Sequence, residues 1–179
     1  MPKWLLGTSH SSATFAVRHM MVTWVQGIFT KVCGTLAFDP MNVAAAEVDV
    51  EIEAGSLFTG VDQRDSHLKS ADFLEVEKYP TITFKSTRVE PVALDHAWVH
   101  GDLTIRGVTR SVVLDARWSG PAHFNDEGTL YTSFGFQAET RINREDFGMV
   151  WNTEMEQGGF MVGKHVYIRL DSEADLAEE

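Results

Sequence analysis

Cysteine and long apolar runs are scarce in this chain of 179 residues. The single cysteine, Cys33, excludes an internal disulfide, and its place in a strand-like run over residues 28–38 predicts a small buried hydrophobic side chain. No apolar run approaches the ~18 residues that a membrane-spanning helix needs. The N-terminal segment turns polar after Trp4-Leu5-Leu6, which is too soon for a signal peptide. The sequence as written therefore predicts a cytoplasmic protein, or a periplasmic one if it is a trimmed mature form.

Positive charge is also scarce. The chain has 15 Lys and Arg against 26 Asp and Glu, a formal net charge of −11. Phosphate backbones and anionic membrane surfaces require clustered Lys and Arg, so nucleic acid is not an expected partner. Five acids and no base fall in the last nine residues. This predicts an acidic C-terminal tail at 172–179, after a single domain at 1–171.

Motifs for metal binding and catalysis are missing from the sequence. Among the seven histidines, only His96 and His100 have the spacing of a helical zinc site. They lie in a strand-like run, where i and i+4 stand ~13 Å apart, too far for one metal. No Gly-x-Ser-x-Gly, Gly-x-Gly-x-x-Gly or P-loop occurs. The sequence therefore predicts no metal site, no cofactor and no enzyme activity.

Alternation of apolar and polar residues dominates what the chain does contain. Residues 47–53 read Glu-Val-Asp-Val-Glu-Ile-Glu, which places Val48, Val50 and Ile52 on one face of an extended chain and four carboxylates on the other. The same alternation recurs at 82–84, 112–118, 134–142 and 166–170. Such a pattern is typical of antiparallel strands with one buried face.

The order of elements favours an all-β barrel. Strand-like stretches fall near 4–10, 13–18, 25–38, 46–53, 80–90, 97–105, 109–119, 129–142 and 163–173. Residues 19–24 suggest a helical turn, and a short helix is predicted near 62–71, with Asp62 as N-cap and Leu68 facing inward. About eight such strands form a sandwich or a closed barrel. Several exceed ten residues, longer than the usual ~5–6, which favours a barrel, whose closure also removes exposed edges.

Seven segments, taken in order, resemble one known family. They are 15–22 (Phe-Ala-Val-Arg-His-Met-Met-Val), Gly27-x-Phe29, 55–60 (Gly-Ser-Leu-Phe-Thr-Gly), 64–73 (Arg-Asp-Ser-His-Leu-Lys-Ser-Ala-Asp-Phe), 79–84 (Tyr-Pro-Thr-Ile-Thr-Phe), 101–109 (Gly-Asp-Leu-Thr-Ile-Arg-Gly-Val-Thr) and 142–148 (Ile-Asn-Arg-Glu-Asp-Phe-Gly). With these segments the chain resembles the YceI-like family of polyisoprenoid-binding proteins from about Trp4 to Ile168. The resemblance implies a lipocalin-like β-barrel that holds a long isoprenoid chain, such as a quinone tail, in its interior.

The expected fold is therefore an all-β, extended, antiparallel eight-stranded lipocalin-like barrel with one short helical insertion. The expected function is non-enzymatic binding, storage or transport of a polyisoprenoid or similar long amphipathic lipid. The alternative is an isomerase or dehydratase that uses the same cavity and relies on His19 or His67. The missing acid–base motifs favour the carrier, and a homodimer is left open.

Charged residues in the matching segments have two interpretations. Arg64 with Asp65, and Arg144 with Asp146, are predicted to fix the helical insertion and a turn, because buried charges need partners. Arg18, together with the histidine after it, follows an inward-facing pair near a chain reversal and is a candidate for contact with a polar head group. The net charge of −11 predicts a neutral head group rather than a pyrophosphate.

Candidate lipid contacts are the inward-facing apolar positions and one histidine. Filling of the barrel by its own side chains is the alternative for each apolar position, because periodicity does not distinguish a packed interior from a cavity. The ligand-binding candidates are Phe15, Val17, His19, Val50, Ile52, Phe84, Phe134, Phe136, Val166 and Ile168.

Overall fold

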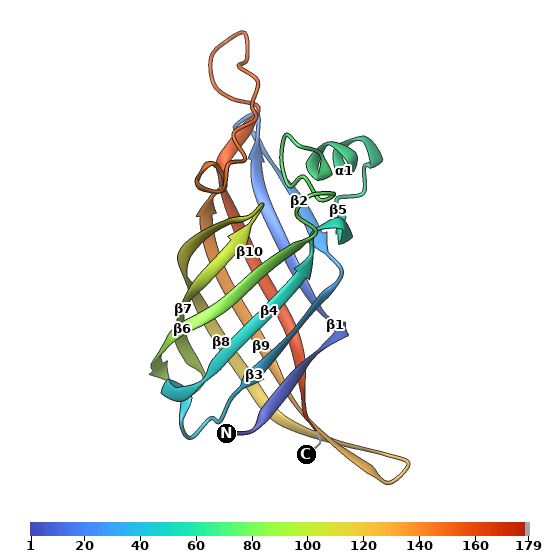
Figure 1. Cartoon of the computed structure of the whole chain (residues 1–179), viewed down its shortest axis with the longest axis vertical. Coiled ribbons are helices and arrows are strands. Elements are labelled where there is room, and N and C mark those ends of the chain that lie inside the picture. Colours follow the sequence, from blue (N-terminus) through green and yellow to red (C-terminus); the bar gives the residue numbers. More distant parts are fainter. Residues whose placement is uncertain (178–179) are drawn as a thin grey trace.

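The chain forms one antiparallel β-barrel with a short helix near one end (Figure 1). The computed structural model describes residues 1–177. Its strands are β1 (Lys3–His19), β2 (Thr23–Phe29), β3 (Val32–Ala37), β4 (Glu47–Glu53), β5 (Leu57–Phe58), β6 (Thr81–Ala93), β7 (His96–Ile105), β8 (Val108–Asp126), β9 (Thr129–Asn143) and β10 (Val162–Leu176). Its helix is α1 (Asp62–Lys69), and 3-10 turns occur at η1 (Val43–Ala45), η2 (Ala54–Ser56) and η3 (Arg144–Phe147).

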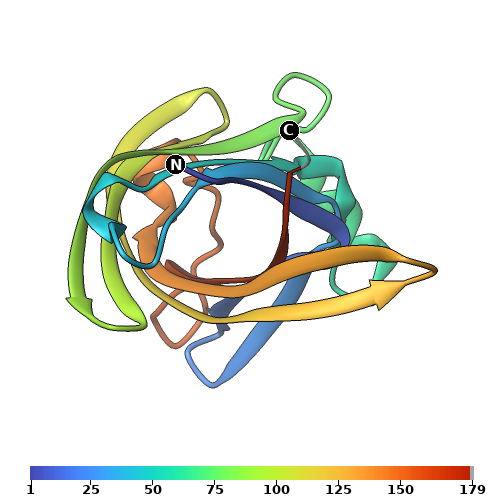
Figure 2. The same cartoon turned by 90° about the horizontal axis from the view of Figure 1, so that it is seen from below.

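The first and last strands close the barrel. The strand order is β10-β9-β8-β7-β6-β4-β3-β1-β2-β5, and β10 also pairs with β1. Strand β1 pairs with β3 over Lys3–Leu6 and with β2 over Ala13–His19, so β2 and β3 occupy one position in the wall. Figure 2, turned by 90°, shows the resulting ring. The prediction of an eight-stranded antiparallel lipocalin-like barrel is confirmed.

The N-terminus and the end of β10 lie at one end of the barrel, the terminal end (Figure 1). Aromatic side chains pack together there. Trp4 meets Phe134 edge to face with ring centroids 5.0 Å apart, and the Trp4 indole N–H donates to the Phe38 carbonyl at 2.8 Å. The ring centroid of Phe38 lies 5.3, 5.4 and 5.1 Å from those of Trp118, Phe134 and Phe136. Such pairs contribute about 0.5–1.5 kcal/mol each beyond burial. These five residues are called the aromatic floor.

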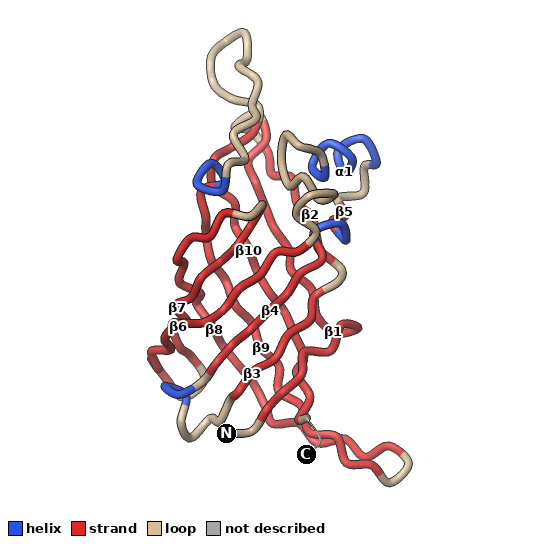
Figure 3. The backbone as a smooth tube through the Cα atoms, in the orientation of Figure 1, coloured by secondary structure: helices blue, strands red, loops and turns tan. Residues whose placement is uncertain are grey.

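The opposite end is called the α1 end, because helix α1 and the turn η3 lie toward it (Figure 3). The turn η1 lies toward the terminal end. Helix α1 falls within the predicted range, although its N-cap is Val61 and Asp62 is its first residue. The prediction of Asp62 as N-cap was wrong, because the extended residue before the helix is Val61, which makes no side-chain capping bond.

Two further local predictions were wrong because strands run further than the alternation indicated. Residues 20–22 form the hairpin turn between β1 and β2, whereas His19, Thr23 and Trp24 belong to the strands. Met20 and Met21 have φ of 49° and 61°, as in type I′ hairpin turns. Strand β10 extends to Leu176 and buries Ser172 and Ala174, so the barrel includes most of the predicted tail from 172. The tail positions 178–179 lie outside the described residues.

Cys33 is exposed, not buried as predicted. It pairs with Glu51 across the ladder, while its neighbour Val32 is completely buried. Because successive strand residues point to opposite faces, the buried position of Val32 places Cys33 on the outer face.

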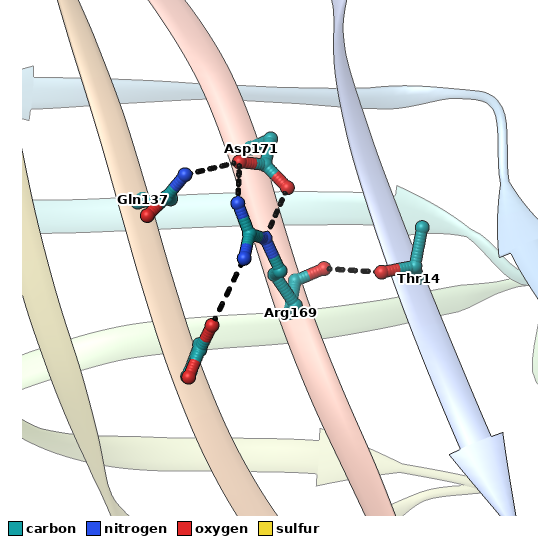
Figure 4. A network of polar contacts seen from close by, with 5 residues as sticks. Thr14, Gln137, Arg169 and Asp171 are labelled. Atoms are coloured by element: carbon teal, nitrogen blue, oxygen red, sulfur yellow. Dashed lines mark hydrogen bonds and ion pairs between the residues drawn. The ribbon is translucent and has the colours of Figure 1, made fainter.

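Polar side chains on the outer face of β9 and β10 form one network (Figure 4). The Arg169 guanidinium donates to both carboxylate oxygens of Asp171, at 2.7 and 3.1 Å, and to Glu139 at 3.2 Å. Gln137 also donates to Asp171, at 2.9 Å. The bonds from Arg169, aided by the bond from Gln137, lower the pKa of the Asp171 carboxyl below its ordinary value.

We therefore expect Arg169→Gln to raise the pKa of Asp171, measured by NMR titration of its side-chain carboxyl. A carboxyl with a lowered pKa stabilises the folded state above its ordinary pKa, and this contribution is lost as the pH falls through the lowered value. Both side chains are exposed, so solvent screening limits the effect on unfolding near neutral pH to about 0.2–1 kcal/mol. Lys31→Gln, which removes a surface pair with Glu53, is the control. An unchanged Asp171 titration in Arg169→Gln contradicts this assignment.

Candidate functional site

An apolar cavity lies inside the barrel, between the aromatic floor and the α1 end. Its volume is about 230 Å³. Every position in the wall contributes inward-facing side chains, among them Phe15 of β1, Leu36 of β3, Val50 of β4, Phe84 of β6, Val99 of β7, Leu114 of β8, Ala138 of β9 and Ile168 of β10. Because each buried methylene gains about 0.8 kcal/mol, this lining can hold an apolar chain without hydrogen bonds to it.

A row of alanines keeps one side of the cavity open. Ala97 of β7 pairs with Ala116 of β8, which pairs with Ala138 of β9. All three line the cavity. The methyl side chains project little into the interior, so this part of the wall leaves space that Leu or Phe would fill.

The structure places eight of the ten predicted contacts on the cavity and two elsewhere. Phe134 is 3% exposed within the aromatic floor and does not line the cavity, whereas Phe136, also in the floor, does. His19 ends β1, where it pairs with Thr23 and Val162, and it does not line the cavity. The cavity-lining candidates are Phe15, Val17, Val50, Ile52, Phe84, Phe136, Val166 and Ile168.

Other lining residues come from irregular segments at the α1 end and were missed by the strand alternation. Leu68, Phe73 and Leu74 line the cavity from the α1 segment, defined here as residues 59–79. Leu68 faces inward as predicted. Phe73 lies in one of the matching sequence segments, which was the only signal for it, because an irregular segment has no fixed period.

A polar cluster around Thr59 holds the α1 segment in place. The Asp65 carboxylate accepts from the Thr59 backbone N–H at 2.9 Å and from its hydroxyl at 2.5 Å. Arg64 donates to the Thr59 hydroxyl oxygen and carbonyl at 2.7 and 2.9 Å. Asp65 is only 8% exposed. These residues thus fix the helical insertion, each through Thr59 and not through an ion pair with the other.

His67, the second histidine of the enzyme alternative, does not line the cavity but packs in an aromatic cluster with Trp151 and the cavity-lining Phe73. Its ring meets Trp151 and Phe73 edge to face, with centroids 4.6 and 5.1 Å apart. Its Nε2 lies 2.7 Å from an oxygen of Asp72. These contacts give His67, in the last turn of α1, a role in packing the helix against Trp151 and Phe73.

Arg144, the first residue of η3, lines the cavity and is 2% exposed. Its guanidinium donates to the carbonyls of Gly163 at 2.9 Å, Val162 at 3.3 Å and Met149. Burial lowers the pKa of this guanidinium. The predicted pairing with Asp146 was wrong, because Asp146 is exposed and the backbone carbonyls of Met149 and of the first two residues of β10 take its place.

The described part of the chain contains neither a metal-binding cluster nor a membrane-spanning helix. Residues 1–177 contain no group of three or more His, Cys, Asp or Glu that could hold a metal ion. No helix within this range is long and apolar enough to cross a membrane.

Fold and cavity together define a lipocalin-like barrel protein with an apolar interior. The YceI-like domain matches residues 4–174, and the chain belongs to the YceI-like family. It is 39% identical to the Escherichia coli protein YceI over 140 residues, covering 78% of this chain and 71% of that protein.

Solved structures share the architecture. Burkholderia cenocepacia BcnA aligns with a TM-score of 0.79 at 21% identity, covering 94% of this chain and 98% of BcnA. A polyisoprenoid binding domain from Saccharophagus degradans aligns with a TM-score of 0.68 at 14% identity, covering 99% and 100% of the two chains. At these identities the two structures support the fold.

One glycine allows Phe84 to lie against the cavity wall. A Cβ added at Gly101 would overlap the Phe84 ring and stand 2.5 Å from the Lys85 carbonyl oxygen. We expect Gly101→Ala to destabilise the fold by about 1–3 kcal/mol, measured by urea unfolding, because the ring and the strand must shift. Gly55→Ala is the control, since its Cβ would meet no atom closer than 4.0 Å. Equal unfolding midpoints for the two variants contradict this packing.

Proposed function

We propose that this protein binds a polyisoprenoid or similar long amphipathic lipid inside the barrel and stores or carries it without chemical change. The continuous apolar cavity carries this proposal. Family membership and the fold shared with a polyisoprenoid binding domain support the same class of ligand.

The dimensions of the barrel suit a long chain. Strand β10, which pairs with β1 along the wall, has 15 residues. At a rise of ~3.3 Å per residue and a tilt of ~40°, such a strand gives a wall about 38 Å high. The aromatic floor fills the terminal end, so the extended part of a tail lies between this floor and the α1 end.

The arrangement of the histidines favours a carrier over an enzyme. The alternative requires His19 or His67 as acid or base at the ligand, yet neither side chain lines the cavity. A general acid or base must come within hydrogen-bond reach of the atom that it protonates or deprotonates.

We expect Ala138→Trp to lower the amount of lipid that co-purifies with the protein, because the indole fills the space beside the alanine row. The measurement is gentle purification, organic extraction and mass spectrometry, with lipid counted per mole of protein. Circular dichroism checks that the barrel still forms.

Arg141→Trp is the matched control, because Arg141 lies on the same strand and is exposed. It should retain the lipid content of the unchanged protein. The proposal fails if extraction of the unchanged protein yields no long-chain lipid, or if folded Ala138→Trp carries the full amount. Turnover of a prenyl substrate that is lost in His19→Ala would favour the enzyme.

A further inference from the structure

The α1 segment fills a gap in the barrel wall. Strand β4 ends at Glu53, and β6, its neighbour in the wall, begins at Thr81. Among residues 1–177, only β5 pairs with β2 on the side away from β1, and only at Ile28 and Phe29. The α1 segment, inserted between β4 and β6, stands beside β2 and β5 (Figure 1). It closes the cavity there with its three apolar lining residues.

The backbone of this segment is bonded to itself and not to the barrel. The N–H of Asp65 donates to the Val61 carbonyl, and that of Tyr79 donates to the Glu75 carbonyl, both at 2.9 Å. No backbone hydrogen bond joins residues 61–79 to another part of the described chain. The polar cluster around Thr59 is also internal to the segment. The segment can therefore move as one body without breaking a strand ladder.

One ion pair ties the segment to the barrel. Arg106, in the turn between β7 and β8, donates to the Glu75 carboxylate at 3.2 Å and to the Gly148 carbonyl at 2.8 Å. Within the described part of the chain, no other side-chain hydrogen bond or ion pair joins residues 59–79 to the rest. Arg106 and Glu75 both have left-handed backbones, with φ of 52° and 50°. Such strain in residues other than glycine concentrates at ligand clamps and switch regions.

The other attachments of the segment are apolar and few. Leu68 is the only apolar residue among the eight of α1. After the helix, Phe73 and Leu74 are buried, and the Phe73 ring meets that of Trp151 with centroids 5.6 Å apart. Opening the segment exposes these few side chains, whereas opening the barrel breaks strand ladders and exposes a whole inner face. The segment is therefore expected to open at a lower free energy than the barrel.

We propose that the α1 segment is a lid, that separation of the Arg106–Glu75 pair opens it, and that the ligand enters and leaves the cavity there. This inference rests on the proposed function. Neither side chain of the pair lines the cavity, so the pair does not hold the ligand. Loss of the pair should therefore speed entry and exit by the same factor and leave the affinity unchanged.

A purely structural role for the pair makes a different prediction. In that case the Arg106 guanidinium only supports the turn between β7 and β8 and the end of η3, through Glu75 and Gly148. Loss of the pair would then lower the unfolding midpoint and leave both exchange rates unchanged.

The test measures exchange of diphenylhexatriene, an apolar dye that fluoresces strongly only out of water, with protein freed of co-purified lipid. Stopped-flow mixing gives the association rate constant, and displacement by excess geranylgeraniol gives the dissociation rate constant. Glu75→Gln keeps the shape of the side chain and removes its charge. Both rate constants should rise by the same factor, at least about threefold, with Kd within about twofold of the unchanged protein.

Three further measurements assign the effect to this pair. Arg106→Gln should act like Glu75→Gln, and the double variant should be no faster than either, because all three remove one interaction. Glu53→Gln is the matched control: it removes a surface pair with Lys31 outside the segment and should leave both rates unchanged. Hydrogen exchange of amides 61–79 should be faster in Glu75→Gln, with the amides of β9 and β10 unchanged.

Salt tests the unchanged protein without any substitution. Raising the ionic strength from about 0.01 M to about 1 M shortens the Debye length from about 30 Å to about 3 Å and weakens the partly exposed pair. Exchange of the dye should become faster in the unchanged protein relative to Glu75→Gln, which has no pair to screen.

The outcomes separate the two proposals. Equal rates in the unchanged protein and Glu75→Gln overturn the lid and leave the proposed function intact. Faster release with a proportionate loss of affinity also overturns it, because the pair would then stabilise the complex and not a closed lid. Failure of both the dye and geranylgeraniol to bind the unchanged protein contradicts the proposed function itself.

Discussion

The pairing of β1 with β10 is the constraint on which the rest of the structure depends. The ladder joins Trp4 to Leu176 near one end and His19 to Val162 near the other, so it runs the length of the wall. Without it, two strand edges would expose unpaired N–H and C=O groups, and the inward faces would lie open to water. Closure makes one surface of the sheet an interior, and the alternation of side chains then decides which residues face it.

Side-chain size divides that interior into a packed part and an open part. Large aromatic rings meet at the terminal end and fill it. Farther along, the row formed by Ala97, Ala116 and Ala138 faces the space with methyl groups. The same hydrophobic character on all inward faces therefore produces a floor in one place and a cavity in another. At the α1 end, Leu68, Phe73 and Leu74 continue the apolar lining.

The sequence predicted the strands, the barrel and most inward-facing positions, because a period of two is local and directly visible. It did not separate Phe134 from Phe136, since alternation gives the face of a residue and not its height along the barrel. Cys33 was misjudged because an apolar run hides which residue faces outward. The partners of Arg144 are backbone carbonyls of Met149 and of the start of β10, up to 19 residues away, and no sequence period indicates such carbonyls.

Because β1 pairs with the last strand, β10, the barrel closes only at a late step of synthesis and folding. Residues 162–176 complete the wall, so a chain still under synthesis has no enclosed space until its final strand emerges. Contacts of such long sequence separation form late and slowly, because loop-closure entropy opposes them. Before that step the nascent sheet presents its apolar face along an open seam. That face stays open from the side until β10 pairs with β1.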